Sequence, residues 1–253
     1  MVSVALESLN STVKAAASGH RTLAEKAFAT LHEAIVTGVL EPGERLPIEG
    51  LAETFDMSPM PIREALRRLD SAGLVENVPH RGARVTELSI EDLTEVYEVR
   101  LALEPLAVRH GAERFTAEDR AAAEDALARL MAAAKSESTS EVLVAHTDFH
   151  FALYSAAGSR WLEQLIRPLW ESSERYRLAS SSVQRSVAER AEEHERMLDA
   201  CVRHDPEDAE QELRNHLART ANAVSHSMGG EDLFDLDEPV AKPGRRDRAA
   251  ATS

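Results

Sequence analysis

Apolar residues recur three and four positions apart along most of the chain, which is the spacing of helices that bury one face. In the first ninety residues this spacing predicts three short helices, at residues 22–37, 46–55 and 57–73. The third helix is the best delimited, because Ser58 is a favoured N-cap and Gly73 is a favoured stop. Its Ile62, Leu66 and Leu69 lie on one face, which we expect to pack on a core.

The pattern changes after this helix. Two short strand-like runs, at residues 74–78 and 83–86, flank a turn and predict a β-hairpin. Helices followed by a hairpin form a winged helix-turn-helix, and we assign residues 21–88 to this domain. Residues 1–20 have modest helical character, and we expect them to form an N-terminal arm.

From residue 89 onward the pattern is helical only. It predicts six helices, at roughly residues 89–114, 116–135, 141–157, 159–179, 183–203 and 206–227. Short breaks separate these helices, so we expect an antiparallel bundle over residues 89–228. Residues 229–253 are rich in glycine, proline and charge without periodicity, and they predict a disordered tail. The expected fold is mainly α, an N-terminal winged helix-turn-helix followed by an antiparallel six-helix bundle.

Charge and composition narrow the function. The 253 residues include 29 Lys and Arg against 44 Asp and Glu, a net charge of −15, which argues against non-specific coating of nucleic acid. Five arginines are nevertheless concentrated within 22 residues, at Arg63, Arg67, Arg68, Arg81 and Arg84. On a helix such residues are more often a solvated surface than a DNA contact. The single cysteine and the lack of an apolar run of roughly 20 residues predict a soluble, cytoplasmic protein without a membrane partner.

Several separate motifs in the first ninety residues make a DNA contact the favoured interpretation of these arginines. They lie at residues 35–46, 51–52, 58–66, 73–75 and 81–85. In this order they closely resemble the GntR family of bacterial regulators, and the resemblance covers most of residues 22–90. The DNA-contacting set that we expect is Arg45, Ser58, Met60, Arg63, Arg67, His80, Arg81 and Gly82. Pro59 stands where many members have arginine, so this contact is missing and a different operator or weaker binding is expected.

Four histidines lie on the apolar faces of three bundle helices. His146 and His150 are four residues apart and share a helix face, while His194 and His216 lie on two further helices. An inward-facing imidazole must be hydrogen-bonded or coordinated to a metal, because burying it without either kind of partner is unfavourable. Four such rings can converge on one divalent ion. Unrelated core or rim histidines are the alternative, and spacing alone favours that alternative.

The bundle also resembles a known domain. Residues 93–222 match the FCD ligand-binding domain of the FadR-type branch of the GntR family, at Arg100 with Glu104 and at residues 149–153, 156–158, 193–194 and 215–217. Many members bind a metal through an acidic residue and three histidines, which His150, His194 and His216 match. The usual acidic position is His146 here, and Asp148 points to another side of its helix. We therefore expect an all-histidine site for Zn²⁺ or Ni²⁺.

A ligand-responsive transcription regulator is the favoured interpretation. A small carboxylic acid would complete the coordination of the metal, with Arg100 as a second anchor; the alternative for Arg100 is a salt bridge to Glu104. A homodimer would read a palindromic operator in double-stranded DNA and, as a repressor, would be released by the acid. We expect no enzymatic activity. The alternatives are a metal-dependent enzyme, with Glu193 as the nearest general base, and a metal-stabilised scaffold without effector.

Overall fold

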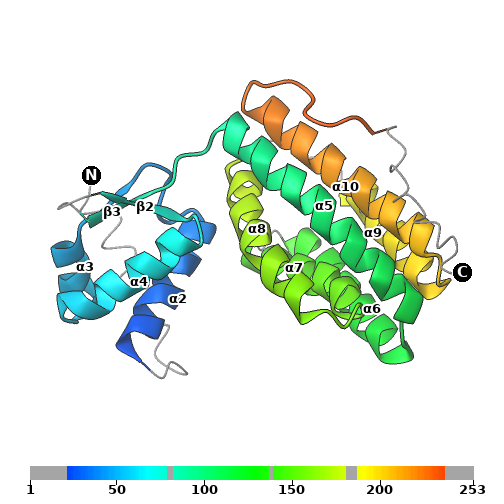
Figure 1. Cartoon of the computed structure of the whole chain (residues 1–253), viewed down its shortest axis with the longest axis horizontal. Coiled ribbons are helices and arrows are strands. Elements are labelled where there is room, and N and C mark those ends of the chain that lie inside the picture. The colour runs from blue at the N-terminus through cyan, green and yellow to red at the C-terminus, as the bar shows by residue number, and fades with distance from the viewer. Residues whose placement is uncertain (1–21, 79–81, 137–138, 181–186, 237–253) are drawn as a thin grey trace, which may run out of the picture.

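The computed structural model describes residues 22–78, 82–136, 139–180 and 187–236, which fold into two modules (Figure 1). Each module has its own hydrophobic core. The expected fold, a winged helix-turn-helix followed by a helical bundle, is confirmed. The arm expected at residues 1–20 lies outside the described residues.

Three helices and a three-stranded sheet form the winged module. The helices are α2 (Leu23–Val36), α3 (Ile48–Phe55) and α4 (Pro59–Ser71), and the strands are β1 (Arg45–Leu46), β2 (Val75–Val78) and β3 (Gly82–Val85). All pairings are antiparallel, in the order β1-β3-β2. The strand β1 was not expected, because two residues are too few to show an alternating pattern.

The boundaries of α4 lie where the sequence predicts them. Ser58 occupies the N-cap position in an extended conformation, but its side chain makes no capping hydrogen bond. Pro59 is the first helical residue, where its missing N–H has no intrahelical partner to lose. Ile62, Leu66 and Leu69 are buried in the core of the winged module, beside Leu31 of α2. The opposite face of α4 is thereby turned outward.

Six helices form the bundle. They are α5 (Ile90–Arg114), α6 (Ala117–Ser136), α7 (Thr139–Ser155), α8 (Arg160–Ala179), α9 (Val187–Val202) and α10 (Pro206–Ser227). The hydroxyl of Ser89 and the carboxylate of Asp205 cap α5 and α10 by accepting backbone N–H groups at 3.1 Å. The largest fully buried side chains of the bundle include Trp170, Tyr97 and Phe149. No helix in the described part of the chain is long and apolar enough to cross a membrane.

A short segment after α10 is ordered, so the prediction of a disordered tail is wrong for residues 229–236. The carboxamide of Asn222 accepts hydrogen bonds from the amides of Leu233 and Phe234, at 2.8 and 3.0 Å, and donates to the carbonyl of Phe234 at 2.9 Å. Leu233 and Phe234 also pack against the core of the bundle. One buried asparagine therefore holds a segment whose composition alone suggests disorder. Residues 237–253 lie outside the described residues.

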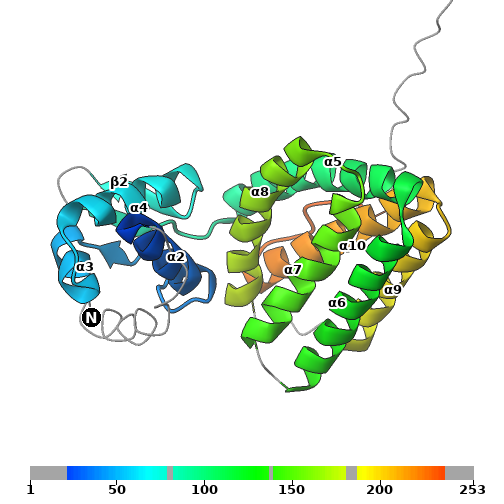
Figure 2. The ribbon, with the colours of Figure 1, turned by 90° about the horizontal axis from the view of Figure 1, so that it is seen from below.

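Helix α8 lies at the end of the bundle that faces the winged module (Figures 1 and 2). The buried guanidinium of Arg175 donates hydrogen bonds to the carbonyls of Gly73, at 3.5 Å, and of Thr86. The imidazole of His32 on α2 lies 3.0 Å from the carboxylate of Glu171. One helix of the bundle thus contacts the end of α4, the end of β3 and the middle of α2.

Candidate functional site

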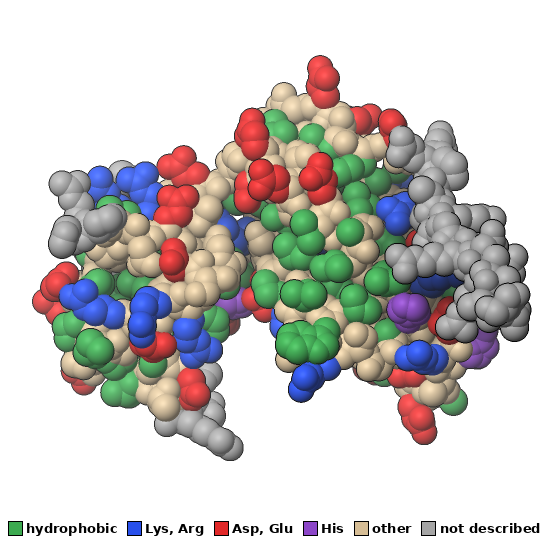
Figure 3. Space-filling model, in the orientation of Figure 1, with side chains coloured by type: hydrophobic (Ala, Val, Ile, Leu, Met, Phe, Trp, Pro, Cys, Tyr) green, Lys and Arg blue, Asp and Glu red, His purple; other side chains and the backbone are tan. Residues whose placement is uncertain are grey.

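The outer face of α4 carries the side chains expected to reach DNA. Arg63 and Arg67 are exposed, and Met60 is 69% exposed. Arg67 forms an ion pair with Glu64 on the same helix. Two arginines and a thioether therefore project outward from a short helix with an accessible N-terminus, an arrangement that suits the major groove. Figure 3 shows basic side chains on this side of the winged module. Their contacts with DNA remain a prediction.

The winged sheet adds a second basic element. Arg45 on β1 lies directly opposite Arg84 on β3, and Arg84 lies opposite Glu76 on β2. Like charges on directly opposed residues repel, and a phosphate between the two guanidinium groups would relieve that repulsion. Arg84 was not in the expected DNA-contacting set, because only the pairing of β1 with β3 brings it beside Arg45.

The tip of the hairpin is only partly described. His80 and Arg81 lie outside the described residues, so their predicted roles are untested. Gly82 is described and has φ +95°, which favours glycine. A Cβ at this position would collide with the carbonyl oxygen of Leu46. Gly82 is therefore needed for the pairing of β1 with β3, whatever it contributes to DNA binding.

The four predicted histidines come together inside the bundle. His146, His150, His194 and His216 are all buried, and each offers a ring nitrogen within 4.8 Å of the others. The Nε2 atoms of His150 and His194 are 3.2 Å apart. Nitrogen ligands of a tetrahedral Zn²⁺ lie about 3.3 Å from one another, so this pair already has the separation that such an ion requires.

The hydrogen bonds behind two of the rings orient them as ligands. Nδ1 of His150 lies 3.2 Å from the hydroxyl of Tyr154, which itself donates to Glu104 at 2.7 Å. Nδ1 of His216 lies 2.8 Å from a carboxylate oxygen of Glu193. In both rings the proton then belongs on Nδ1, and Nε2 carries the lone pair that a metal needs.

Glu193 was the acidic residue that an enzymatic interpretation would use as general base. Its second carboxylate oxygen accepts from Arg219 at 3.1 Å, in addition to the contact with His216. Glu193 is therefore engaged as a partner of the histidine cluster. Asp148 is confirmed to lie elsewhere, since its carboxylate binds Arg129 at 2.8 Å near the surface.

His146 differs from the other rings. The guanidinium of Arg177 donates to its Nδ1 at 2.8 Å, and Arg177 also forms an ion pair with Glu174. A guanidinium has no acceptor, so Nδ1 must carry the lone pair and the proton of a neutral ring must sit on Nε2. Trp170 stacks on the same ring, with centroids 5.1 Å apart.

The electrostatics of the cluster favour neutral rings. Burial lowers the pKa of His146 well below its usual value, and the positive charge of Arg177 lowers it further. Burial likewise lowers the pKa of His150, with smaller contributions from the neighbouring histidines. Neutral imidazoles can coordinate a cation, whereas imidazolium ions cannot. The nitrogen donors and the hydrogen bonds behind them fit a divalent ion such as Zn²⁺ or Ni²⁺.

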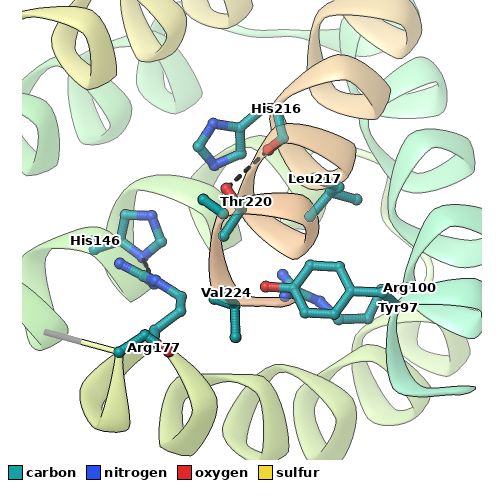
Figure 4. Close-up of a pocket in the computed structure, with 10 residues that line it drawn as sticks. Tyr97, Arg100, His146, Arg177, His216, Leu217, Thr220 and Val224 are labelled. Atoms are coloured by element: carbon teal, nitrogen blue, oxygen red, sulfur yellow. Dashed lines mark hydrogen bonds between the residues drawn. The ribbon is translucent and has the colours of Figure 1, made fainter. Parts of the chain in front are cut away.

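A cavity adjoins the cluster (Figure 4). Its walls include His146, His216, Arg100, Arg177 and Tyr97. Arg100, the predicted effector anchor, donates to Glu104 at 2.5 and 3.1 Å and to a serine of α8. The salt bridge considered for it is thus present, and its role as an anchor stays a prediction.

Sequence reasoning missed two residues of this cavity. Arg177 reaches the cavity with a side chain that is 17% exposed. The hydroxyl of Tyr97 is buried and has no hydrogen-bond partner among the described residues, and Figure 4 shows it directed into the cavity. Tyr97 lies on the buried face of α5, where a tyrosine is expected to be an ordinary core residue. Only the cavity shows that Tyr97 and Arg177 both line a space beside the histidine cluster.

Comparisons with known proteins agree with both modules. The family model described as "Bacterial regulatory proteins, gntR family" matches residues 23–85, and the one described as "FCD domain" matches residues 95–219. The transcriptional regulator BphR of Paraburkholderia xenovorans (strain LB400) is 32% identical over 81% of this chain and 86% of BphR. The transcriptional repressor GlaR of Escherichia coli (strain K12) is 28% identical over 78% of this chain and 93% of GlaR. The solved structure of E. coli McbR, 25% identical, has a TM-score of 0.73 and covers 83% of this chain and 100% of McbR.

Proposed function

The chain belongs to the gntR family of bacterial regulatory proteins and carries an FCD domain, and we propose that it is a transcriptional repressor whose binding to a palindromic operator is controlled by a small carboxylic acid bound beside a metal ion. The observation that carries this proposal is the double role of α8. Its Glu174 and Arg177 lie at the histidine cluster, while its Glu171 and Arg175 contact the winged module. A ligand that shifts this helix therefore changes how the winged module is held.

For DNA recognition, α4 would enter the major groove with Arg63 and Arg67 toward base edges and phosphates. The wing would approach the backbone through Arg45, Arg84 and the hairpin tip. Each chain has one winged module, with α4 as its proposed recognition helix. A palindromic operator has two half-sites, so two chains are needed to bind it. Such a regulator would act in the cytoplasm, where its DNA is.

An exposed apolar surface supports the homodimer that this requires. Val99 and Leu106 of α5 are 44% and 40% exposed, and Trp161 and Leu165 of α8 are 66% and 54% exposed. Figure 3 shows hydrophobic side chains gathered over these two helices. Large exposed apolar surfaces commonly mark association sites. Because α8 also contacts the winged module, a dimer formed through this surface would set the separation of the two winged modules.

His150, His194 and His216 would hold the metal with His146, and the bound ion would supply a Lewis acid for a carboxylate. The other carboxylate contacts would come from the cavity. Tyr97 offers a hydroxyl, Arg177 offers a guanidinium, and Arg100 contributes positive charge. An acidic ligand is favoured over a basic one because two arginines line this cavity.

Regulation requires that the acid bind one arrangement of the modules more tightly than the other. Coupling free energies between sites are typically about 1–3 kcal/mol, which corresponds to roughly 5- to 150-fold in affinity. If the acid binds more tightly to the arrangement that does not fit the operator, it releases the protein from DNA. The protein then acts as a repressor in the absence of the acid.

The test is selection of bound fragments from the source genome with purified protein at physiological salt. Recovery of one palindromic site, lost with Arg63→Ala and kept with Arg120→Ala on the exposed face of α6, is the expected result. Operator affinity is then measured with the metal and a panel of small carboxylic acids. Recovery of no site above background, or equal recovery by Arg63→Ala, would refute the assignment of α4 as the recognition helix.

A further inference from the structure

In the arrangement described above, His146 cannot act as a metal ligand. Its Nδ1 lone pair is occupied by a hydrogen bond from Arg177, at 2.8 Å, and its Nε2 must then carry the proton. Neither nitrogen is free to coordinate a cation. The other rings with assigned tautomers, His150 and His216, present Nε2 unprotonated.

Glu174 is the residue that could release His146. One of its carboxylate oxygens, Oε1, lies 4.0 Å from Nδ1 of His146 and is bound by Arg177. Its other oxygen, Oε2, is buried and has no hydrogen-bond partner among the described residues. Glu174 itself is 4% exposed. A buried carboxylate beside an imidazole is the usual support of a metal-bound histidine, which donates its Nδ1–H to it.

We propose that Arg177 gates the fourth metal ligand: a carboxylate that enters the cavity draws Arg177 away from His146, and His146 then coordinates the ion. This proposal rests on the metal-binding function proposed above. Arg177 is suited to the exchange because its side chain lines the cavity and is partly exposed, so it can reach a ligand without unfolding its helix. Tyr97, across the cavity, supplies a hydroxyl to the same carboxylate (Figure 4).

The exchange conserves charges and protons. Arg177 changes its partner from His146 and Glu174 to the entering carboxylate. The ring gives its Nε2 proton to solvent water and takes a proton from solvent water on Nδ1, and Glu174 then accepts a hydrogen bond from this Nδ1–H. The Nε2 lone pair is thereby released to the ion, and the number of protons on His146 does not change.

The consequence is that metal and carboxylate bind cooperatively. Each ligand favours the arrangement in which Arg177 has left His146, so each must raise the affinity of the other by the same factor. This differs from simple coordination of the acid to the metal, because the effect depends on Arg177. The residue that responds to the carboxylate, Arg177, lies on α8 two residues from Arg175, which contacts the winged module.

The experiment measures the affinity of the full-length apoprotein for Co²⁺, whose visible spectrum distinguishes four-coordinate sites from others. Titrations are run in sodium acetate and in sodium chloride of equal ionic strength. Acetate is expected to raise the affinity of the wild type by 5-fold or more, within the usual range of coupling between sites. In Arg177→Met, the affinity in chloride is expected to rise about tenfold, and acetate is expected to add nothing. Arg120→Met on α6 should behave as the wild type.

The outcomes separate this proposal from the one it rests on. If the wild type does not bind Co²⁺, both the metal site and the gate are refuted. Binding that is abolished by His150→Ala but changes neither with acetate nor with Arg177→Met refutes the gate and leaves the metal site. An acetate effect that persists in Arg177→Met also refutes the gate, because it assigns the effect to direct coordination. If Arg177→Met does not fold, equal affinity of the wild type for Co²⁺ in acetate and in chloride still refutes the gate.

Discussion

Arg175 offers the most direct test of how the two modules communicate. Its side chain is 4% exposed, and its guanidinium donates to the carbonyls of Gly73 and Thr86. Gly73 lies just beyond α4, and Thr86 directly follows β3. A single buried side chain of the bundle therefore holds the residue just beyond α4 and the base of the wing.

We expect Arg175→Met to weaken the docking of the winged module by about 2 kcal/mol. Hydrogen bonds from charged donors contribute roughly 1.5–3 kcal/mol each. The bond to Gly73 is long, at 3.5 Å, and water can replace a guanidinium at a carbonyl near the surface, so the loss should be close to that of one bond. A loss of about 2 kcal/mol changes the ratio of docked to undocked molecules about 30-fold.

Hydrogen exchange at the amide of Ser89 measures this docking. That amide lies at the start of the bundle, directly after the segment that joins the modules, and donates to the hydroxyl of Tyr176 at 3.3 Å, next to Arg175 on α8. Exchange at Ser89 and proteolysis of residues 86–89 should both accelerate in Arg175→Met, and operator affinity should respond less to the carboxylate. Arg120→Met, which removes only an exposed pair with Glu124, is the control. Unchanged exchange and cleavage in a folded Arg175→Met protein would refute the assigned role of Arg175.

Three further predictions concern single sites. His150→Ala should lower both metal content and melting temperature, because it removes a buried imidazole that we propose as a metal ligand; exposed His110→Ala should change neither, and full metal occupancy in His150→Ala would exclude His150 from the site. Gly82→Ala should destabilise the winged module by at least about 2 kcal/mol in thermal unfolding, through its positive φ and its contact with Leu46. Gly38→Ala has a positive φ but open space, so an equal loss there would contradict the steric argument. Burial raises the pKa of Cys201 to about 12, so iodoacetamide at pH 8 should label this thiol only as fast as the bundle opens. Its contribution to stability is complete below the unfolded pKa of about 8.5 and is lost as the pH rises toward 12; rapid labelling of the folded protein would contradict this burial.

The helices could be predicted from the sequence because their signals are local. The 3.6-residue period, the capping hydroxyl of Ser89, the N-cap position of Ser58 followed by Pro59, and the stop at Gly73 are all signals within a few residues. The six helices of the bundle begin and end close to their predicted limits for the same reason. The inward position of the four histidines also followed from helix periodicity.

Other features depend on which segments meet. The strand β1 exists only because β3 pairs with it, and this pairing brings Arg84 beside Arg45. The segment after α10 is ordered only because Asn222 meets its backbone. Neither contact leaves a periodic signal, since both join residues through space.

The chemistry of the site shows the same division. Sequence periodicity and motifs identified the histidines as a group, but they could not assign a tautomer to any ring. That assignment comes from Tyr154, Glu193 and Arg177, which approach the rings from other positions or other helices. The sequence by itself determined the elements, because these follow from spacing along one chain, and its resemblance to the GntR family and the FCD domain pointed to α4 and to the four histidines. Only the tertiary structure decided that α8 joins the cluster to the winged module and that Arg177 blocks His146, because both depend on contacts between elements far apart in the sequence.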